Sequence, residues 1–241
     1  MQELLAPLSN PSLKDVFIER FEDLILSGQL KIGQKLPSER ELALRLGVSR
    51  PVVHSGLIDL EIKGLVTLTP RVGAVVNDYR RKGSLALLNS LVAYHQGDLE
   101  GDLLTSLLAM RRLFEMETAR LAAIHRDERI LGEIGETIAA EAELPRREAA
   151  RIAALDFRFH HLLALASGNR VYPLLINSFK QVYVNLTTRF FQDPSVVETV
   201  HALHRRLYAA VTDRDPAAAA DVMDRLLTHG ADHLPRNART G

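Results

Sequence analysis

The sequence lacks several features that would assign it to a class at once. It contains no cysteine, which excludes a disulfide framework and a thiolate metal site. No apolar run approaches the roughly 20 residues that span a bilayer, and residues 1–10 lack the charged start and long apolar core of a secretory signal. We therefore expect a cytoplasmic protein that has no membrane partner.

The chain also lacks a net charge, because 30 Lys and Arg residues balance 30 Asp and Glu residues. A uniformly basic surface is excluded, so any binding to DNA must come from a local patch. Apolar residues make up 46% of the chain and charged residues 25%, which is typical of a folded globular protein. Its 241 residues suit one large domain or two smaller domains with separate cores.

Strand signals are scarce. Only residues 65–77 hold two short β-branched runs, around Pro70 and Gly73, and these predict one small hairpin. Residues 78–84 are polar and charged and contain a glycine, which is typical of a linker. Beyond them the spacing of apolar residues is helical, and it predicts helices at about 85–95, 100–124, 127–143, 147–167, 170–191, 195–213 and 216–233.

The segment before the hairpin has the pattern of two short helices joined by a tight turn, after a first helix over residues 12–28. Ser38 can cap a helix that carries Glu41 three residues later, which is the capping-box arrangement. Gly47 ends this helix, and Ser49 caps the next one. A helix, this helical pair and a hairpin are typical of a winged helix-turn-helix.

Basic side chains gather at the turn and on the hairpin, at Lys35, Arg40, Arg45, Arg50 and Arg71. Guanidinium groups suit phosphate oxygens and guanine edges, and a helix N-terminus adds N–H donors for a phosphate. The alternative is solvated surface charge paired with nearby acids. Those acids are Glu39, Glu41 and Asp59. The complete arrangement favours DNA binding.

Three motifs in this region, Leu36-Pro-Ser-Glu-Arg-Glu-Leu-Ala43, Leu46-Gly-Val-Ser-Arg50 and Arg71-Val-Gly73, resemble the GntR family of bacterial transcription regulators. The resemblance covers nearly all of residues 12–78. It implies that Arg40 and Arg50 contact DNA and that the wing glycine, Gly73, enters the minor groove. Together with Ser38, Ser49, His54 and Arg71, these residues form the candidate DNA-binding set.

His54 marks a departure from that family. The family pattern usually continues with Val-Arg-Glu-Ala, whereas this chain has Val53-His54-Ser55-Gly56. An imidazole reaches less far than a base-reading arginine, and in its neutral form it offers one donor instead of a fork. The resemblance therefore does not fix the operator preference.

The remainder resembles the helical ligand-binding domain of the FadR-type branch of the same family, over about residues 100–230. The motifs that carry this resemblance include Arg111-Arg-Leu-Phe-Glu115, Asp156-Phe-Arg-Phe-His160 and Ala166-Ser-Gly-Asn169. We therefore predict a mostly α protein. A winged helix-turn-helix occupies residues 1–78, a linker residues 79–84, and an all-helical effector-binding and dimerisation domain of six or seven helices residues 85–241.

A metal site is expected in the helical domain. Asp156 and His160 are four residues apart and share one helix face, and an aspartate with a neutral imidazole can chelate zinc, nickel or manganese. His204 lies on the apolar stripe of another helix and should point into the same interior. The resemblance implies these three ligands and a fourth on the last helix, where this chain has Leu226. We expect water to complete a three-ligand site; the alternative is a metal-free group that forms a core network or contacts the effector.

Arg111 falls in an apolar stripe and should face the interior, where a guanidinium needs an anionic partner. One interpretation is a structural salt bridge with an acid such as Glu115. The other is a clamp for the carboxylate or phosphate of an effector. Asn169 and Arg189 are further candidates for effector binding.

The leading hypothesis is a ligand-responsive regulator, not an enzyme, that binds a double-stranded operator as a homodimer and has a small organic acid as its effector. A second hypothesis is a metal-dependent hydrolase that uses Asp156, His160 and His204. A third is an architectural DNA-binding protein whose helical domain only dimerises.

Overall fold

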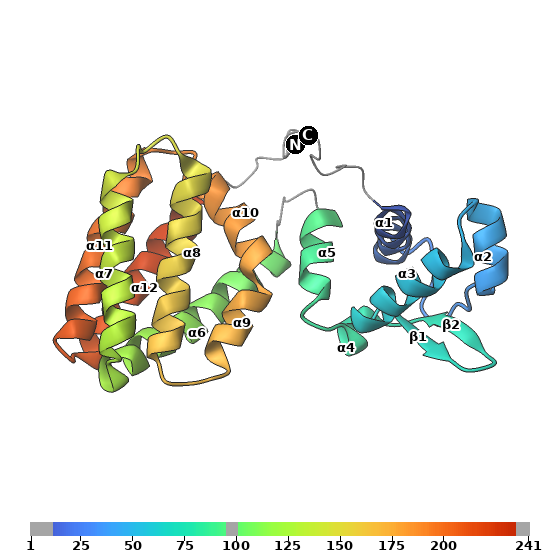
Figure 1. The fold of residues 1–241 in the computed structure, drawn as a ribbon, viewed down its shortest axis with the longest axis horizontal. Coiled ribbons are helices and arrows are strands. Elements are labelled where there is room, and N and C mark those ends of the chain that lie inside the picture. The colour runs from blue at the N-terminus through green and yellow to red at the C-terminus, as the bar shows by residue number, and fades with distance from the viewer. Residues whose placement is uncertain (1–11, 95–100, 235–241) are drawn as a thin grey trace, which may run out of the picture. The chain divides into compact units, whose positions relative to one another are not determined.

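The computed structural model describes residues 12–94 and 101–234 (Figure 1). The chain divides into two compact units between His95 and Gln96. The N-terminal unit carries one two-stranded sheet, and every other regular element in the described ranges is helical. The predicted mostly α fold class is confirmed. None of the helices in these ranges has the length and apolarity needed to cross a membrane.

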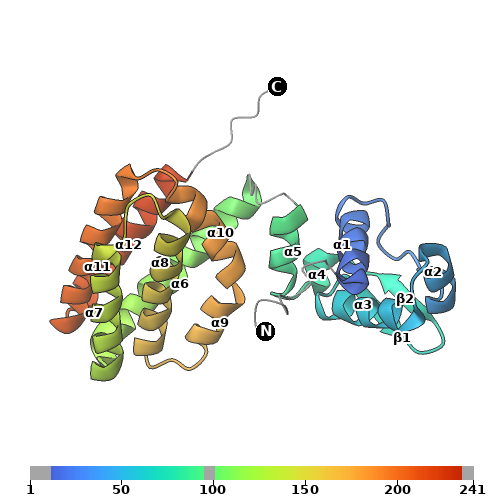
Figure 2. The ribbon, with the colours of Figure 1, turned by 45° about the horizontal axis from the view of Figure 1, so that its top comes forward.

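The N-terminal unit is the predicted winged helix-turn-helix. Its elements are α1 (Leu13–Leu26), α2 (Glu39–Leu46), α3 (Arg50–Ile62), β1 (Val66–Thr69) and β2 (Gly73–Val76). The strands are antiparallel, with Val66 opposite Val76, and β1 packs beside α3 (Figure 2). The segment before α2 pairs with the other edge of β2, where the Leu36 N–H donates to the Ala74 carbonyl at 2.8 Å.

Local signals account for the helix boundaries at the turn. The Ser38 hydroxyl accepts a hydrogen bond from the Glu41 N–H at 3.3 Å, and Gly47 ends α2 with a φ of 67°, which glycine adopts without strain. The predicted capping box is only half formed, because the Glu41 carboxylate pairs with Arg45 instead of the Ser38 N–H. Ser49 stands at the N-cap of α3, but its side chain makes no capping hydrogen bond.

The segment expected to be a linker, residues 79–84, is ordered and belongs to the N-terminal unit. It contains the short helix α4 (Tyr79–Lys82), whose N-cap Asp78 accepts a hydrogen bond from the Arg80 N–H. The Ser84 hydroxyl donates to the Ile62 carbonyl at 2.8 Å. The polar residues that suggest a linker therefore cap α4 and form a hydrogen bond to the end of α3.

Helix α5 (Leu87–Tyr94) belongs to the N-terminal unit, although the helical domain was predicted to begin at residue 85. It packs on α1, where the Ser90 hydroxyl donates to a carboxylate oxygen of the buried Glu22 at 2.8 Å. Lys63, at the end of α3, pairs with the same oxygen. A buried carboxylate needs such partners, so this pairing holds α5 on the N-terminal unit.

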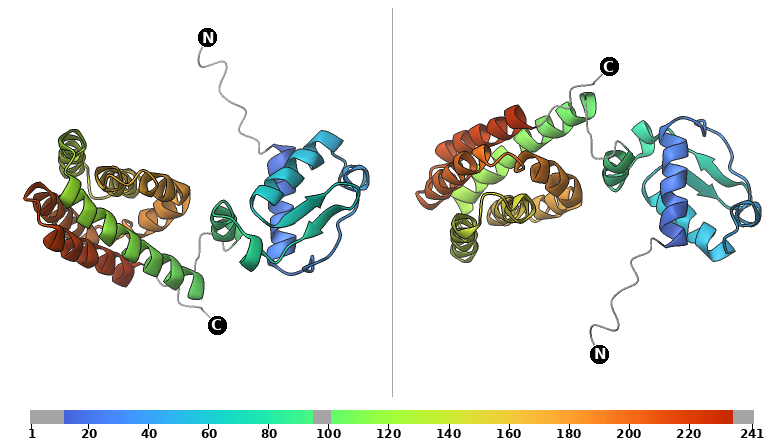
Figure 3. Two further views of the ribbon diagram at one scale, coloured as in Figure 1. Left: turned by 90° about the horizontal axis from the view of Figure 1, so that it is seen from below. Right: turned by 90° about the horizontal axis from the view of Figure 1, so that it is seen from above.

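The described part of the C-terminal unit forms seven helices, within the predicted six or seven, although that prediction counted α5 and took residues 170–191 as one helix. They are α6 (Asp102–His125), α7 (Glu128–Glu143), α8 (Ala149–Ala166), α9 (Tyr172–Ser178), α10 (Lys180–Phe190), α11 (Ser195–Thr212) and α12 (Pro216–His233). Helix α6 packs against α8, α11 and α12, and Figure 3 shows it in green between the yellow α8 and the red α12. The core of the unit lies between these helices.

One predicted helix of this unit is wrong in its extent. Residues 170–191 form two helices, α9 and α10, separated at Phe179, whose φ of −99° and ψ of 0° leave the helical region. Phe179 lines the cavity of this unit. The apolar spacing continues through the break, so periodicity alone does not reveal it. The predicted starts are confirmed elsewhere, since Pro173 lies in the first turn of α9 and Asp215 caps α12.

A first prediction concerns the contact of α1 with α3. A Cβ added at Gly56 of α3 would lie 2.3 Å from Cδ1 of Phe17, so the Gly56→Ala variant must displace an aromatic ring in the core. We expect it to lower the free energy of unfolding by about 1–3 kcal/mol, although alanine is the better helix former. Hydrogen exchange of the α1 and α3 amides across a urea titration measures this change.

The matched control is Gly132→Ala in α7, where an added Cβ meets nothing within 4 Å. Alanine should stabilise that helix by about 0.5–1 kcal/mol. A Gly56→Ala protein as stable as the wild type would show that the α1–α3 contact is not tightly packed.

Candidate DNA-binding surface and effector cavity

Helix α3 presents two of the candidate DNA-binding residues on one exposed face. Arg50 and His54 are one turn apart, and their side chains are 72% and 58% exposed. The opposite face of the helix is buried through Val53, Leu57 and Leu60. The core thus fixes α3 in the orientation that turns Arg50 and His54 towards solvent.

Both residues share one partner, Glu39, the first residue of α2. Arg50 Nε donates to Glu39 Oε2 at 3.2 Å, and His54 Nδ1 lies 2.7 Å from Glu39 Oε1. The hydrogen bond with His54 lowers the pKa of Glu39 below its usual range, and the hydrogen bond with Arg50 adds to this effect against the opposing effect of burial. Part of the surface-charge alternative is therefore realised, because Arg50 pairs with Glu39.

The other candidates of this set are also exposed. Arg40 lies on α2, and in the described ranges it forms no ion pair. Arg71 and Gly73 lie in the wing, where both have a positive φ, of 66° and 99°; such a φ is uncommon for arginine. Ser38 and Ser49 occupy the N-caps of α2 and α3. The fold brings the whole set into one unit, and its contact with DNA stays a prediction.

The C-terminal unit contains a cavity of about 80 Å³, several times the space of roughly 10–15 Å³ that one water molecule requires. Most of its lining is apolar. The polar side chains in the lining are Arg111, Glu115, Asp156, His160, Tyr183 and Thr187. A largely apolar pocket with a few convergent polar groups is the usual form of a small-molecule site.

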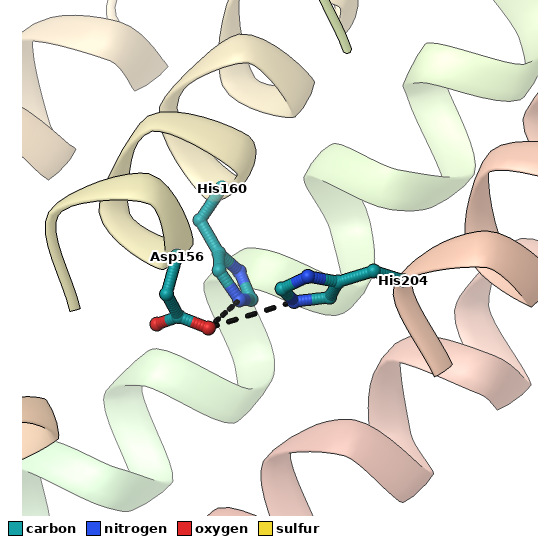
Figure 4. A group of neighbouring side chains, drawn as sticks. All are labelled: Asp156, His160 and His204. Carbon is teal, nitrogen blue, oxygen red and sulfur yellow. Dashed lines mark ion pairs between the residues drawn. The ribbon is translucent and has the colours of Figure 1, made fainter. Parts of the chain in front are cut away.

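Asp156, His160 and His204 meet beside this cavity (Figure 4). Asp156 and His160 project from α8 and His204 from α11, and all three are buried. Asp156 Oδ1 lies 3.9 Å from His160 Nε2 and 3.5 Å from His204 Nε2. The structure thus brings together the three residues of the expected ligand set.

Glu141 of α7 orients His204 and is not among the site residues predicted from the sequence. His204 Nδ1 lies 2.9 Å from one carboxylate oxygen of Glu141 and 3.0 Å from the other. Burial lowers the pKa of His204, but the Glu141 carboxylate outweighs it, so the pKa is raised overall. The missed signal is the position of Glu141 on the buried stripe of α7 that also contains Ile134 and Thr137.

Arg111 is held by two partners in the same network. Its Nε donates to Glu115 Oε1 at 2.6 Å, and its Nη2 donates to the Tyr183 hydroxyl at 2.7 Å. Tyr183 in turn donates to Asp156 Oδ2 at 2.6 Å, while the other oxygen of Glu115 pairs with His160. The predicted salt bridge of Arg111 with Glu115 is confirmed. Arg111 also lines the cavity, and its role as a clamp for an effector stays a prediction.

Glu115 remains ionised although it is buried. Burial raises its pKa, but Arg111 and His160 outweigh this effect and hold the pKa at about 2. Above the ordinary pKa of a glutamate, this pairing stabilises the folded state in full, and the contribution is lost as the pH falls towards 2. A carboxylate held in this way is a weak general base at neutral pH.

The donor set fits a divalent cation. Among the described residues, the buried Nε2 atoms of His160 and His204 find no hydrogen-bond partner, which is costly unless another group satisfies them. Ligands bound about 2.0–2.2 Å from a tetrahedral zinc lie about 3.3–3.5 Å apart, close to the observed separations from Asp156. The network also contains three carboxyl groups, those of Asp156, Glu115 and Glu141, and one guanidinium, which bonds directly to Glu115 alone among them. A cation bound beside Asp156 would offset this excess of acid.

Two expected effector residues do not line the cavity. Asn169 lies in the loop after α8, where its side-chain oxygen accepts a hydrogen bond from the Val171 N–H at 2.9 Å and so stabilises the turn. Arg189 is half-buried on α10, but its neighbour Phe190 lines the cavity in its place. Leu226, the position expected for a fourth ligand, does line it.

Two family models match the chain. Residues 14–76 match the bacterial regulatory proteins of the gntR family, and residues 106–229 match the FCD domain. The Glc operon transcriptional activator of Escherichia coli (strain K12) is 32% identical over 216 residues, which cover 85% of this chain and 82% of the relative. The fatty acid metabolism regulator protein of Yersinia pestis (strain Pestoides F) is 28% identical over 198 residues, with 82% and 79% covered.

Among solved structures, that of Lar, which controls the expression of the Listeria monocytogenes agr system, has a TM-score of 0.66. The match covers 96% of this chain and 100% of that chain at 16% sequence identity. At this identity, the likeness concerns the fold alone.

A second prediction tests whether Glu141 positions His204. Glu141→Gln removes the negative charge that fixes the imidazole, and we expect it to weaken zinc binding by about tenfold to a hundredfold. Calorimetric titration of the full chain with zinc measures the affinity. Glu143→Gln, an exposed position on the same helix, is the control and should bind as the wild type does. An unchanged affinity in Glu141→Gln would remove Glu141 from the site.

Proposed function

Because the chain belongs to the GntR family of bacterial regulatory proteins and carries an FCD domain, we propose that this transcription regulator binds its operator as a homodimer and responds to a small organic acid. One observation carries the proposal: a winged helix-turn-helix that exposes Arg50 and His54 is joined to a helical unit with a mostly apolar cavity that Arg111 and Asp156 also line. A regulator with a chromosomal target works in the cytoplasm.

Operator binding is assigned to the winged helix-turn-helix, α1 to β2, which is the reading head of the protein. A two-fold dimer reads an inverted repeat, and adjacent half-sites lie about 34–36 Å apart, one turn of DNA. In this proposal Arg50 and His54 face the major groove, while Arg71 and Gly73 approach the minor groove through the wing. Arg40 contacts the phosphate backbone from α2.

The effector cavity favours an anion of modest size. Arg111 is the one arginine or lysine among the residues that line it, and a guanidinium binds carboxylate or phosphate through paired hydrogen bonds. Asp156, His160 and His204 would hold a zinc, nickel or manganese ion. Once bound, such an ion supplies positive charge beside the cavity. Leu226 cannot ligate, so a coordination position stays open to water or the effector.

Regulation requires that the effector bind two states of the dimer with different affinity. An acid held between Arg111 and the Asp156 cluster would tie α6 to α8 and α11, the helices that carry these residues. The ligand then shifts the population of DNA-binding dimers by its differential affinity.

The comparisons give the hydrolase alternative no support, because the relatives are transcriptional regulators. Beyond Asp156, two carboxylates contact the proposed ligands, and each is paired with an imidazole: Glu115 with His160 and Glu141 with His204. The pKa of about 2 leaves Glu115 a weak base for activating water.

A third prediction tests the reading head. If Arg50 reads a base, Arg50→Ala should weaken binding to the operator by about 1–3 kcal/mol, or roughly 5- to 150-fold. The operator is obtained by selection of the wild-type full chain on a random pool of duplex DNA, and affinities are compared at one salt concentration.

Arg129→Ala, which removes an exposed arginine from α7 in the other unit, is the matched control and should leave the affinity unchanged. An equal affinity for wild type and a folded Arg50→Ala protein would contradict the assignment. The absence of any enriched sequence for the wild type would contradict operator binding itself.

A fourth prediction tests the metal site. Leu226→His supplies an imidazole beside the cluster and should tighten zinc binding about tenfold or more, whereas His160→Ala should abolish it. Leu227→His, which adds an imidazole on the same helix away from the cavity lining, is the control. If neither the wild type nor Leu226→His binds zinc, nickel or manganese in calorimetry, the site is metal-free.

A further inference from the structure

Glu39 bears on which DNA bases the protein recognises, and not only on whether it binds DNA. We infer that Glu39 is a positioning residue that fixes the tautomer of His54, so that His54 Nε2 accepts a hydrogen bond from the exocyclic amino group of adenine or cytosine in the major groove. This inference rests on the proposed operator binding. It assigns a readout to the position where the family usually has an arginine.

Both carboxylate oxygens of Glu39 contact side chains of α3. Oε1 lies 2.7 Å from His54 Nδ1, and Oε2 accepts from Arg50 Nε at 3.2 Å. The Glu39 side chain is 28% exposed, and those of its partners are 58% and 72% exposed. A half-buried acid at the start of α2 thus holds two exposed side chains of α3 in defined positions.

The tautomer follows from the chemistry of these partners. An ionised carboxylate can only accept hydrogen bonds, and the low pKa of Glu39, which the hydrogen bond with His54 lowers, keeps it ionised at neutral pH. The proton of a neutral His54 must therefore reside on Nδ1. The second ring nitrogen, Nε2, is then a hydrogen-bond acceptor without a proton.

An acceptor reads different bases from a donor. In the major groove, adenine presents its N6 amino group and cytosine its N4 amino group, whereas guanine presents two acceptors, O6 and N7. An arginine at this position would favour guanine. A neutral His54 that is held by Glu39 repels guanine and favours adenine or cytosine.

Arg50 does not reproduce this effect, because a guanidinium has five donors and no acceptor. The bond to Glu39 uses one of the five and leaves donors for phosphate or guanine. The charged groups that the structure places against His54 are Glu39 on α2 and, through Glu39, Arg50 on its own helix. The two neighbouring residues of α3 therefore read opposite chemistries.

The test is selection from a random pool of duplex DNA at pH 8 with full-length wild type, His54→Arg and Glu39→Gln. The position read by residue 54 is the one whose base differs between wild type and His54→Arg. There we expect adenine or cytosine for the wild type, preferred over guanine by about fivefold or more, and guanine for His54→Arg. Glu39→Gln should lose the preference at this position, because an amide can donate to or accept from Nδ1.

The matched control is Glu41→Gln, the same change on the same helix in a residue that pairs with Arg45 rather than with α3. It should keep the wild-type preference. The ¹⁵N chemical shifts of the imidazole of His54, in histidine-labelled protein, supply a readout that a general loss of stability does not move. They should show a protonated Nδ1 and a bare Nε2 in the wild type, and a mixture of tautomers in Glu39→Gln.

Two sets of results would overturn the inference while leaving operator binding intact. One is a clear wild-type consensus with guanine at that position, or with no base change in His54→Arg. The other is Glu39→Gln with an unchanged preference, or a wild-type His54 protonated on Nε2. A wild-type pool without any enriched sequence would instead overturn the proposed function.

Discussion

Buried charge is costly unless it is paired, and this constraint organises the C-terminal unit. Asp156 is where the pairing converges. Its two oxygens meet the Tyr183 hydroxyl from α10 and the imidazoles of His160 and His204 from α8 and α11. Side chains from three other positions in the sequence must therefore stay aligned for Asp156 to remain satisfied in the core.

The same constraint extends outward along two branches. Through Tyr183 the network reaches Arg111 and Glu115 on α6, and through His204 it reaches Glu141 on α7. Five helices are thereby tied to one polar cluster next to the cavity. A molecule that binds there perturbs hydrogen bonds shared by all of them, and this is the physical basis on which a small ligand can alter a whole helical domain.

A partly buried charge is also paired in the N-terminal unit, at its surface. Glu39 is placed by the start of α2, yet its bonds reach Arg50 and His54 on α3. A carboxylate beside a DNA-binding face opposes phosphate, so its presence needs a compensating role. Holding an imidazole in one tautomer is such a role, because direction and donor character decide which base edge is read.

Local signals in the sequence determined the reading head and the Asp156–His160 pair of the polar cluster. The helix cap at Ser38, the helix end at Gly47 and the β-branched runs of the hairpin each depend only on residues nearby in the sequence. The spacing of four residues alone places Asp156 and His160 on one helix face. Only the tertiary structure decided the contacts of Glu141 with His204 and of Glu39 with His54, the break at Phe179, and the packing of α5 on α1. The reason is physical. Periodicity reports which face of an element is buried, whereas the partner on that face comes from a distant segment and is chosen by the packing of the whole unit.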